Sequence, residues 1–248
     1  MLQNKNQQLD CPICDSEIIL LGSVDFNKSC GGDLPNSGKL IDYHVCNICQ
    51  FVFSQEIYGW PKEQFINEVY NEQYVKVDED YLQKRLEGNA SLIHKTFPNK
   101  EGIRHLDYGG GNGVLSECLR LQDWNSQSYD PFNSEDEPIE SLGTFDLITV
   151  FEVFEHVPNV NELFKNLSRL TDNQSMVIFS TLLSDGQLNA ATKIDWWYAS
   201  PRNGHISLFS KKSLQLLASQ HSWNLHSFSQ NLHVLYKIPS KWNQHLFN

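Results

Sequence analysis

Two glutamates and a histidine stand within five positions in the stretch TVFEVFEHVPN, directly after an apolar run typical of a buried strand. Glu152, Glu155 and His156 have the spacing i, i+3, i+4, which predicts one common face of a helical turn. His205 follows much later, in NGHISLF. Carboxylate oxygens and imidazole nitrogens are ligands for divalent cations, so we take these four residues as a candidate Mg²⁺ or Mn²⁺ site. Of the four, His205 and Glu152 are the candidate catalytic residues.

A structural role is the alternative for this cluster. Glu155 and His156 would then brace the loop and the start of the next helix, for which Pro158 and Asn159 are ordinary turn and cap residues. Without a metal, His205 could still act as a general base, because the reference pKa of histidine, about 6.5, suits removal of a hydroxyl proton. A buried structural histidine is the remaining reading.

Four of the six cysteines form two C-x-x-C pairs separated by 31 residues: Cys11, Cys14, Cys46 and Cys49. In a reducing compartment such pairs hold a metal more often than a disulfide, and four thiolates suit a closed, tetrahedral zinc site. The alternative is four unrelated buried or redox cysteines. Asp15 and Gln50 occupy the positions where zinc ribbons commonly have glycine. Cys30 and Cys118 are left over, and Cys118 fits a small core position in a helix.

A glycine loop, HLDYGGGNGVL, runs from a predicted strand into a predicted helix. Its spacing fits neither the dinucleotide pattern G-x-G-x-x-G nor a phosphate-binding G-x-x-x-x-G-K-[ST] loop. Glycines at such a turn let the backbone come close to a ligand at the carboxyl end of a strand. Asp130, at the end of the next predicted strand, could accept hydrogen bonds from both ribose hydroxyls. The candidate cofactor-binding residues are Asp107, Gly109, Gly111, Gly113 and Asp130; a plain turn with a solvated aspartate is the alternative.

Strands and helices alternate from residue 103 onward, which predicts an α/β fold with a doubly wound, mostly parallel sheet and an antiparallel closing edge. Residues 10–54 have the composition of short strands and turns, with so little core that a metal would serve as a staple. We therefore divide the chain into a zinc-binding β module over 1–58, a helical linker and cofactor cap over 59–100, and a main domain over 101–248. The predicted strands cover 16–22, 43–53, 103–108, 126–130, 145–151, 175–181, 223–229 and 233–238, and the predicted helices cover 114–121, 160–170 and 211–220.

Composition narrows the class of function. The chain has 248 residues, 40% of them hydrophobic and 20% charged, and a net charge of -11. That acidity disfavours a protein that binds a phosphate backbone. No apolar run approaches the roughly 20 residues of a membrane span, and the first ten residues are polar. We therefore expect a soluble cytoplasmic protein with no membrane and no nucleic-acid partner.

The stretches LDYGGGNG, YDPF, FDLITVFEVFEHVPN and WWYASPRNGHISLFSKKSLQLLA resemble a class I S-adenosylmethionine-dependent methyltransferase preceded by a zinc-ribbon-like module. The resemblance implies that Asp107 and the three glycines hold the methionine end of this cofactor and that Asp130 holds its ribose. The Glu-x-x-Glu-His turn with a later histidine also resembles Mg²⁺- or Mn²⁺-dependent methyltransferases of ubiquinone biosynthesis and of small-RNA 3′ ends. In those families this set binds the metal that carries the acceptor hydroxyl.

One departure from the family pattern concerns the third strand. Only 14 residues separate Asp130 from the strand FDLITV, too few for the usual helix, strand and adenine-binding acid. We expect this strand to be short or missing, and Asp136 or Glu137 is a candidate replacement for the acid. By the same resemblance, Tyr70 and Tyr74 belong to the segment that closes over the cofactor.

These observations favour methyl transfer from S-adenosylmethionine to a small-molecule acceptor: a sugar, a nucleotide sugar or another natural-product intermediate. The aromatic run from Trp196 to Tyr198 would be a lid or an acceptor platform, or else buried packing. The alternatives are an RNA-modifying methyltransferase or RNA-binding module that uses the zinc ribbon for recognition, and a non-catalytic scaffold.

Overall fold

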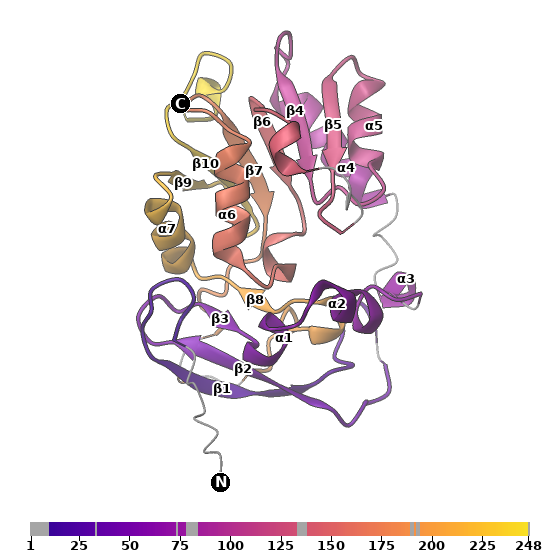
Figure 1. Ribbon diagram of the computed structural model, residues 1–248, viewed down its shortest axis with the longest axis vertical. Helices are drawn as coiled ribbons and strands as arrows, with labels where there is room; N and C mark the ends of the chain where they lie inside the picture. The colour runs from indigo at the N-terminus through magenta and orange to yellow at the C-terminus, as the bar shows by residue number, and fades with distance from the viewer. Residues whose placement is uncertain are drawn as a thin grey trace.

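The computed structural model describes residues 10–32, 34–72, 74–77, 84–132, 138–188, 191 and 194–247. Asp136 and Glu137 lie outside these residues. Two sheets form the framework, a six-stranded sheet in the upper part of Figure 1 and a four-stranded sheet below it. No helix in the described part of the chain combines the length and apolar character that a membrane span needs.

The six-stranded sheet has the strand order β5-β4-β6-β7-β10-β9. β5, β4, β6 and β7 are parallel neighbours, whereas β10 runs antiparallel to both β7 and β9. The predicted parallel sheet with an antiparallel edge is therefore confirmed. The bounds are β4 Arg104–Tyr108, β5 Asn125–Tyr129, β6 Leu147–Val150, β7 Met176–Ser180, β9 Asn224–Ser227 and β10 Leu232–Tyr236.

Helices cover both faces of this sheet, with α6 in front of it and α4 and α5 behind it in Figure 1. Alternate residues of one strand pack into the two hydrophobic cores, one on each face of the sheet. Val177 and Phe179 of β7 pack in the cluster that includes α6 and α7, while Met176 and Ile178 pack in the cluster that includes α4 and α5. The helices are α4 Lys84–Thr96, α5 Val114–Arg120, α6 Val160–Arg169 and α7 Lys211–Gln220.

The stretch between β5 and β6 contains no strand among its described residues. A single 3₁₀ turn, η1 Ile139–Ser141, lies in it, and β5 forms the edge of the sheet. The expected loss of the third strand agrees with this.

The four-stranded sheet has the order β1-β2-β3-β8, and all its pairings are antiparallel. Its first three strands, β1 Ile18–Asp25, β2 Leu40–Cys46 and β3 Val52–Phe53, belong to the predicted N-terminal module. The fourth, β8 Ser207–Leu208, comes from the predicted main domain. Three helices follow β3 and lie between the two sheets in Figure 1: α1 Gln55–Tyr58, α2 Lys62–Glu68 and α3 Tyr74–Val77.

Candidate active site

The four cysteines of the two C-x-x-C pairs converge at the end of the N-terminal module where β1 starts and β2 ends. Their sulfur atoms all lie within 4.8 Å of one another, and the closest pairs are Cys11–Cys49 at 3.5 Å and Cys14–Cys46 at 3.4 Å. In a tetrahedral Zn²⁺ site with Zn–S bonds of about 2.3 Å, sulfur atoms would be about 3.8 Å apart. The cluster therefore fits a zinc ion held by four thiolates.

The two cysteine pairs have the same backbone geometry. The amide N–H of Asp15 donates to the carbonyl of Cys11, and that of Gln50 donates to the carbonyl of Cys46. Asp15 and Gln50 both adopt a left-handed conformation, with φ of 52° and 61°. The turns that glycine normally completes in zinc ribbons form here with non-glycine residues. The amide of Cys49 also donates to the sulfur of Cys46 at 3.4 Å, as expected for a metal-binding turn.

The glycine loop folds over the buried side chain of Asp107. Thr149 donates a hydrogen bond to Asp107 Oδ1 at 2.8 Å, and Gly110 packs so close to the carboxylate that a Cβ atom there would overlap with it. Gly109, Gly111 and Gly113 have φ of 77°, 55° and 78°, conformations that favour glycine. The pKa of Asp107 is raised to about 7, mainly by burial; the Thr149 hydrogen bond lowers it, and the charge of Asp130 contributes to the rise.

Asp130 lies at the mouth of the same loop. Its carboxylate accepts hydrogen bonds from the amides of Gly111, at 2.9 Å, and Phe132, at 2.7 Å. Beside it opens a cavity of about 540 Å³, and the predicted capping residues Tyr70 and Tyr74 border this cavity together with Gly109 and Asp130. The loop, the acid and the two tyrosines thus meet around one space large enough for a nucleoside.

The acid and histidine cluster forms above the carboxyl ends of β6 and β7. A 3₁₀ turn, η2 Phe154–His156, carries Glu155 and His156, and the loop before β8 brings in His205. Ligand atoms of these three buried residues lie within 4.8 Å of one another. Glu155 Oε2 and His156 Nδ1 are buried and make no hydrogen bond within the described structure. A buried carboxylate and two imidazoles with such open atoms fit a divalent cation.

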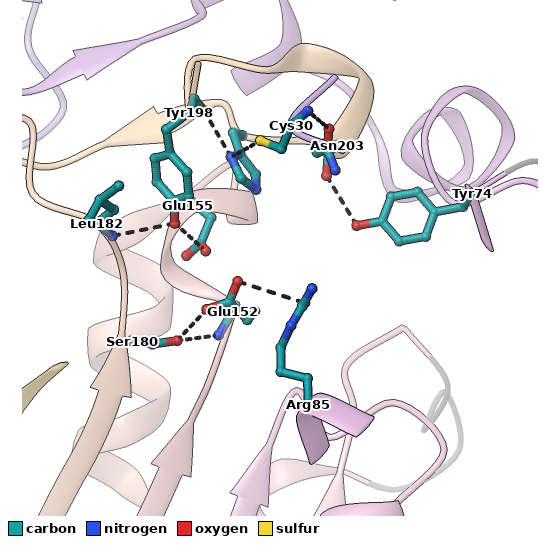
Figure 2. A network of polar contacts seen from close by, with 10 residues as sticks. Cys30, Tyr74, Arg85, Glu152, Glu155, Ser180, Leu182, Tyr198 and Asn203 are labelled. Carbon is teal, nitrogen blue, oxygen red and sulfur yellow. Dashed lines mark hydrogen bonds and ion pairs between the residues drawn. The ribbon is translucent and has the colours of Figure 1, made fainter. Parts of the chain in front are cut away.

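Glu152 is separate from this group. It precedes η2 and has φ of 54°, so it does not share the helical face that the i, i+3, i+4 spacing predicts. Its Oε1 accepts a hydrogen bond from Ser180 at 2.7 Å, and its Oε2 lies 3.9 Å from Arg85 Nη1. Figure 2 shows Glu152 directed toward Ser180 and Arg85, with Glu155 paired to Tyr198 above it. The structure brings together three of the four predicted cation ligands.

Hydrogen bonds fix the orientation of the cluster. Tyr198 donates its hydroxyl to Glu155 Oε1 at 2.6 Å, and its carbonyl oxygen lies 2.9 Å from His205 Nδ1 (Figure 2). Because the carbonyl only accepts, His205 carries its proton on Nδ1 and leaves the Nε2 lone pair available. Burial raises the pKa of Glu155 to about 8 and lowers that of His205 to about 4. Burial also lowers the pKa of His156 well below its usual value.

A second cavity, of about 740 Å³, is also bordered by Glu152. His205, Tyr198 and the exposed Trp197 border it. Arg85 and Glu152 border both cavities, so the two spaces meet at this ion pair. The arrangement places two cavities, of about 540 and 740 Å³, next to one carboxylate.

The aromatic run that preceded His205 in the sequence has two roles. Trp196 and Tyr198 are buried in the core of the N-terminal module, whereas the side chain of Trp197 is 55% exposed and borders the larger cavity. Buried packing therefore holds for Trp196 and Tyr198, and the lid or acceptor platform stays a prediction for Trp197. Sequence reasoning missed Gly110 and Arg85, although the run of three glycines, in which Gly110 is the middle one, was a signal for Gly110.

A protein-family model described as a methyltransferase domain matches residues 81–227, more than half of the chain. In solved structures, an O-methyltransferase family protein from Burkholderia thailandensis has a TM-score of 0.51 and 13% identity, over 72% of this chain and 63% of that chain. TnmH has a TM-score of 0.50 and 14% identity, over 74% of this chain and 63% of its own. At these identities, the similarity shows the fold.

The curated relatives include ubiquinone biosynthesis O-methyltransferases. The enzyme from Colwellia psychrerythraea is 29% identical over 100 residues, which cover 31% of this chain and 41% of that enzyme. The enzyme from Vibrio campbellii is 25% identical over 131 residues, 39% of this chain and 56% of its own. This chain spans about half the length of these relatives. With the matching family model, the glycine loop and the sheet order, the chain belongs to the S-adenosylmethionine-dependent methyltransferase family.

Proposed function

We propose that this protein transfers the methyl group of S-adenosylmethionine to a hydroxyl oxygen of a small molecule. The observation that carries the proposal is the meeting of the two cavities at Glu152 and Arg85. The first cavity would hold the cofactor against the glycine loop and Asp130. The second would hold the acceptor beside His205. The similarity to O-methyltransferases supports oxygen as the methylated atom.

The reaction asks little covalent chemistry of the protein. The acceptor oxygen forms a bond to the methyl carbon as the carbon–sulfur bond breaks, and the sulfur keeps the electron pair as neutral S-adenosylhomocysteine. The hydroxyl proton must leave the acceptor. The protein therefore needs to align the two substrates and to stabilise or accept that proton.

A divalent cation bound by Glu155, His156 and His205 is part of this proposal. When bound, such a cation lowers the pKa of an acceptor hydroxyl and orients its oxygen. The open atoms of Glu155 and His156 and the Nε2 lone pair of His205 would supply the ligands. Tyr198 would hold Glu155 and His205 in place from behind. Glu152, which lies beside Arg85, would stand at the boundary with the cofactor.

The acceptor class that we propose is a hydroxylated small molecule such as a sugar, a nucleotide sugar or a natural-product intermediate. The larger cavity combines hydrogen-bonding side chains with the exposed face of an aromatic ring. Asn89, Asn231 and Ser229 border it along with Trp197. Amides and hydroxyls match acceptor hydroxyl groups, while an indole ring covers the apolar face of a sugar or an aromatic ring.

The test is formation of S-adenosylhomocysteine by purified protein with S-adenosylmethionine and a panel of catechols, phenols and methyl glycosides. The protein is first treated with a chelator and then supplied with MnCl₂, MgCl₂ or buffer. We expect turnover with at least one class of acceptor and its loss in Glu155→Gln, with Glu117→Gln, an exposed glutamate on α5, as the control. Turnover that survives chelation and Glu155→Gln unchanged would refute the cation, and absence of cofactor binding would refute methyl transfer.

A further inference from the structure

The N-terminal module contacts the candidate active site through a tyrosine. Tyr43, in the middle of β2, is fully buried and donates its hydroxyl to the backbone carbonyl of His205 at 2.7 Å. Buried hydroxyl and carbonyl groups are costly to leave without a partner, so this bond fixes the position of the His205 backbone relative to β2. The histidine is thus held by a residue that lies far before it in the sequence.

The sheet of the module extends this support. β8 begins two residues after His205 and pairs with β3, so that Val52 lies opposite Leu208. The amide of Ser54 donates to the carbonyl of Ile206 at 3.0 Å, and the amide of Ile206 donates to the carbonyl of Glu155 at 2.9 Å. Ile206 and the short strand β8 after it therefore link the module to the segments that carry Glu155 and His205.

The loop between β1 and β2 reaches the same place from the other side. Lys28 donates from Nζ to the carbonyl of Trp196 at 2.8 Å, and its own carbonyl accepts from Ser200 Oγ at 3.0 Å. The amide of Cys30 donates to Asn203 Oδ1 at 2.8 Å, as Figure 2 shows. These bonds fasten the loop to the segment that precedes β8.

Cys30 then forms part of the wall of the larger cavity. Cys30 and Gly31 both border this cavity, and Cys30 Sγ lies 3.6 Å from His205 Nδ1. The backbone carbonyl of Val77 packs against Gly31, so a side chain at that position would collide with it. The loop of the N-terminal module and α3 are therefore fitted closely together beside the acceptor space.

We infer that the zinc-binding module is a working part of the active site: Tyr43 positions His205, and Cys30 bounds the acceptor and sets which acceptors fit. This inference rests on the proposed methyl transfer. It makes the module a source of acceptor selectivity within one active site. The zinc ion at the far end of the β1–β2 hairpin would stabilise the strands that carry both residues.

The first experiment removes the Tyr43 hydroxyl. Tyr43→Phe keeps the buried ring, and we expect kcat to fall by about tenfold or more with the best acceptor of the panel, because small displacements of a reacting group cost large factors in rate. S-adenosylhomocysteine affinity should stay within twofold of the parent value. Tyr58→Phe is the matched control, because Tyr58 also belongs to the N-terminal module and is partly buried, but it packs against the core cluster that includes α6 and α7. If Tyr43→Phe kept the kcat of the parent, or if kcat fell equally in Tyr43→Phe and Tyr58→Phe, the positioning role of Tyr43 would be refuted.

The second experiment changes Cys30, which borders the larger cavity. Cys30→Leu should raise the KM of the bulkier acceptors severalfold more than that of the slimmer ones, and Cys118→Leu, on α5, should leave this ratio unchanged. In zinc-loaded Cys118→Ala protein, iodoacetamide should modify Cys30, block turnover and leave S-adenosylhomocysteine binding intact, with the acceptor protecting the thiol. If Cys30→Leu left the ratio of the two KM values unchanged, or if turnover stayed complete after modification of Cys30, Cys30 would not bound the acceptor. If the unmodified parent protein did not bind S-adenosylhomocysteine, the proposed function itself would be refuted.

Discussion

The imidazole rings of His156 and His205 lie 4.9 Å apart between their centroids, although one residue belongs to a turn after β6 and the other to the loop before β8. The two rings meet at an angle of 71°. Because Glu155 lies beside them with a ligand atom in reach of both, the geometry joins three side chains from two distant segments. The N-terminal module contacts this group through Tyr43, which donates to the carbonyl of His205.

Gly110 gives a test of the glycine loop that sequence reasoning did not anticipate. Gly110→Ala places a methyl group against the carboxylate of Asp107 and the hydroxyl of Ser128, so the loop must move away. We expect S-adenosylhomocysteine affinity to fall by at least about tenfold, measured by calorimetry. In the control, Gly88→Ala on α4, the methyl group meets open space, and the helix should be more stable by about 0.5–1 kcal/mol. Equal affinity in the two variants would contradict the close packing of this loop.

Arg85 is expected to hold the negative end of the cofactor. It lies at the meeting point of the two cavities, 3.9 Å from Glu152, and a methionine carboxylate is an anion that a guanidinium binds with two donors. Arg85→Ala should weaken S-adenosylhomocysteine binding by about tenfold, as the loss of a charged hydrogen bond does. Lys95→Ala, at the exposed end of the same helix, should bind as the parent does. The prediction fails if both variants bind equally well.

The zinc site predicts a metal content of one zinc ion per chain. Cys46→Ser removes one of the four sulfur ligands and leaves the other three, so zinc content and the thermal unfolding midpoint should both fall. Cys118→Ser removes a cysteine outside the cluster and should keep the full zinc content. Elemental analysis of the purified variants provides the measurement. The same zinc content in both variants would exclude the four-cysteine site.

Asp107 predicts a pH dependence of stability. Burial raises its pKa from 3.8 to about 7, so the folded protein retains a proton that the unfolded chain releases between these values. The contribution of Asp107 to the free energy of unfolding therefore decreases as pH rises from about 4 to about 7, and is constant above that. Asp107→Asn removes this contribution. Urea unfolding at about pH 5 and about pH 7.5 should show the variant gaining stability relative to the parent at the higher pH; a constant difference would refute the raised pKa.

Much of the fold could be predicted from the sequence because its signals are local. The strands β6, β7 and β10 coincide with apolar or β-branched runs. The helix α6 begins at Val160 after the cap residue Asn159, whose side chain accepts from the amide of Glu162. The turn after β6 was also visible in the residue types. Its geometry was not, because Glu152 takes a left-handed conformation that spacing along the chain does not reveal.

The parts that escaped prediction depend on contacts between distant segments. β8 is only two residues long and exists because β3 offers it a free edge. Arg85 and Cys30 carry no motif of their own, and their place beside the site follows from how α4 and the β1–β2 loop pack against the sheet. The short connection between β5 and β6, which holds no strand among its described residues, could be read from chain length.

Calorimetric titration of S-adenosylhomocysteine tests the central claim, that the glycine loop and Asp130 hold the cofactor. The account predicts saturable binding of one molecule per chain to the parent protein and to Asp123→Asn, an exposed aspartate whose surface ion pair contributes little. Asp130→Asn should bind at least about tenfold more weakly, because it loses charged hydrogen bonds. No binding by the parent, or equal binding by the Asp130 and Asp123 variants, would contradict the account.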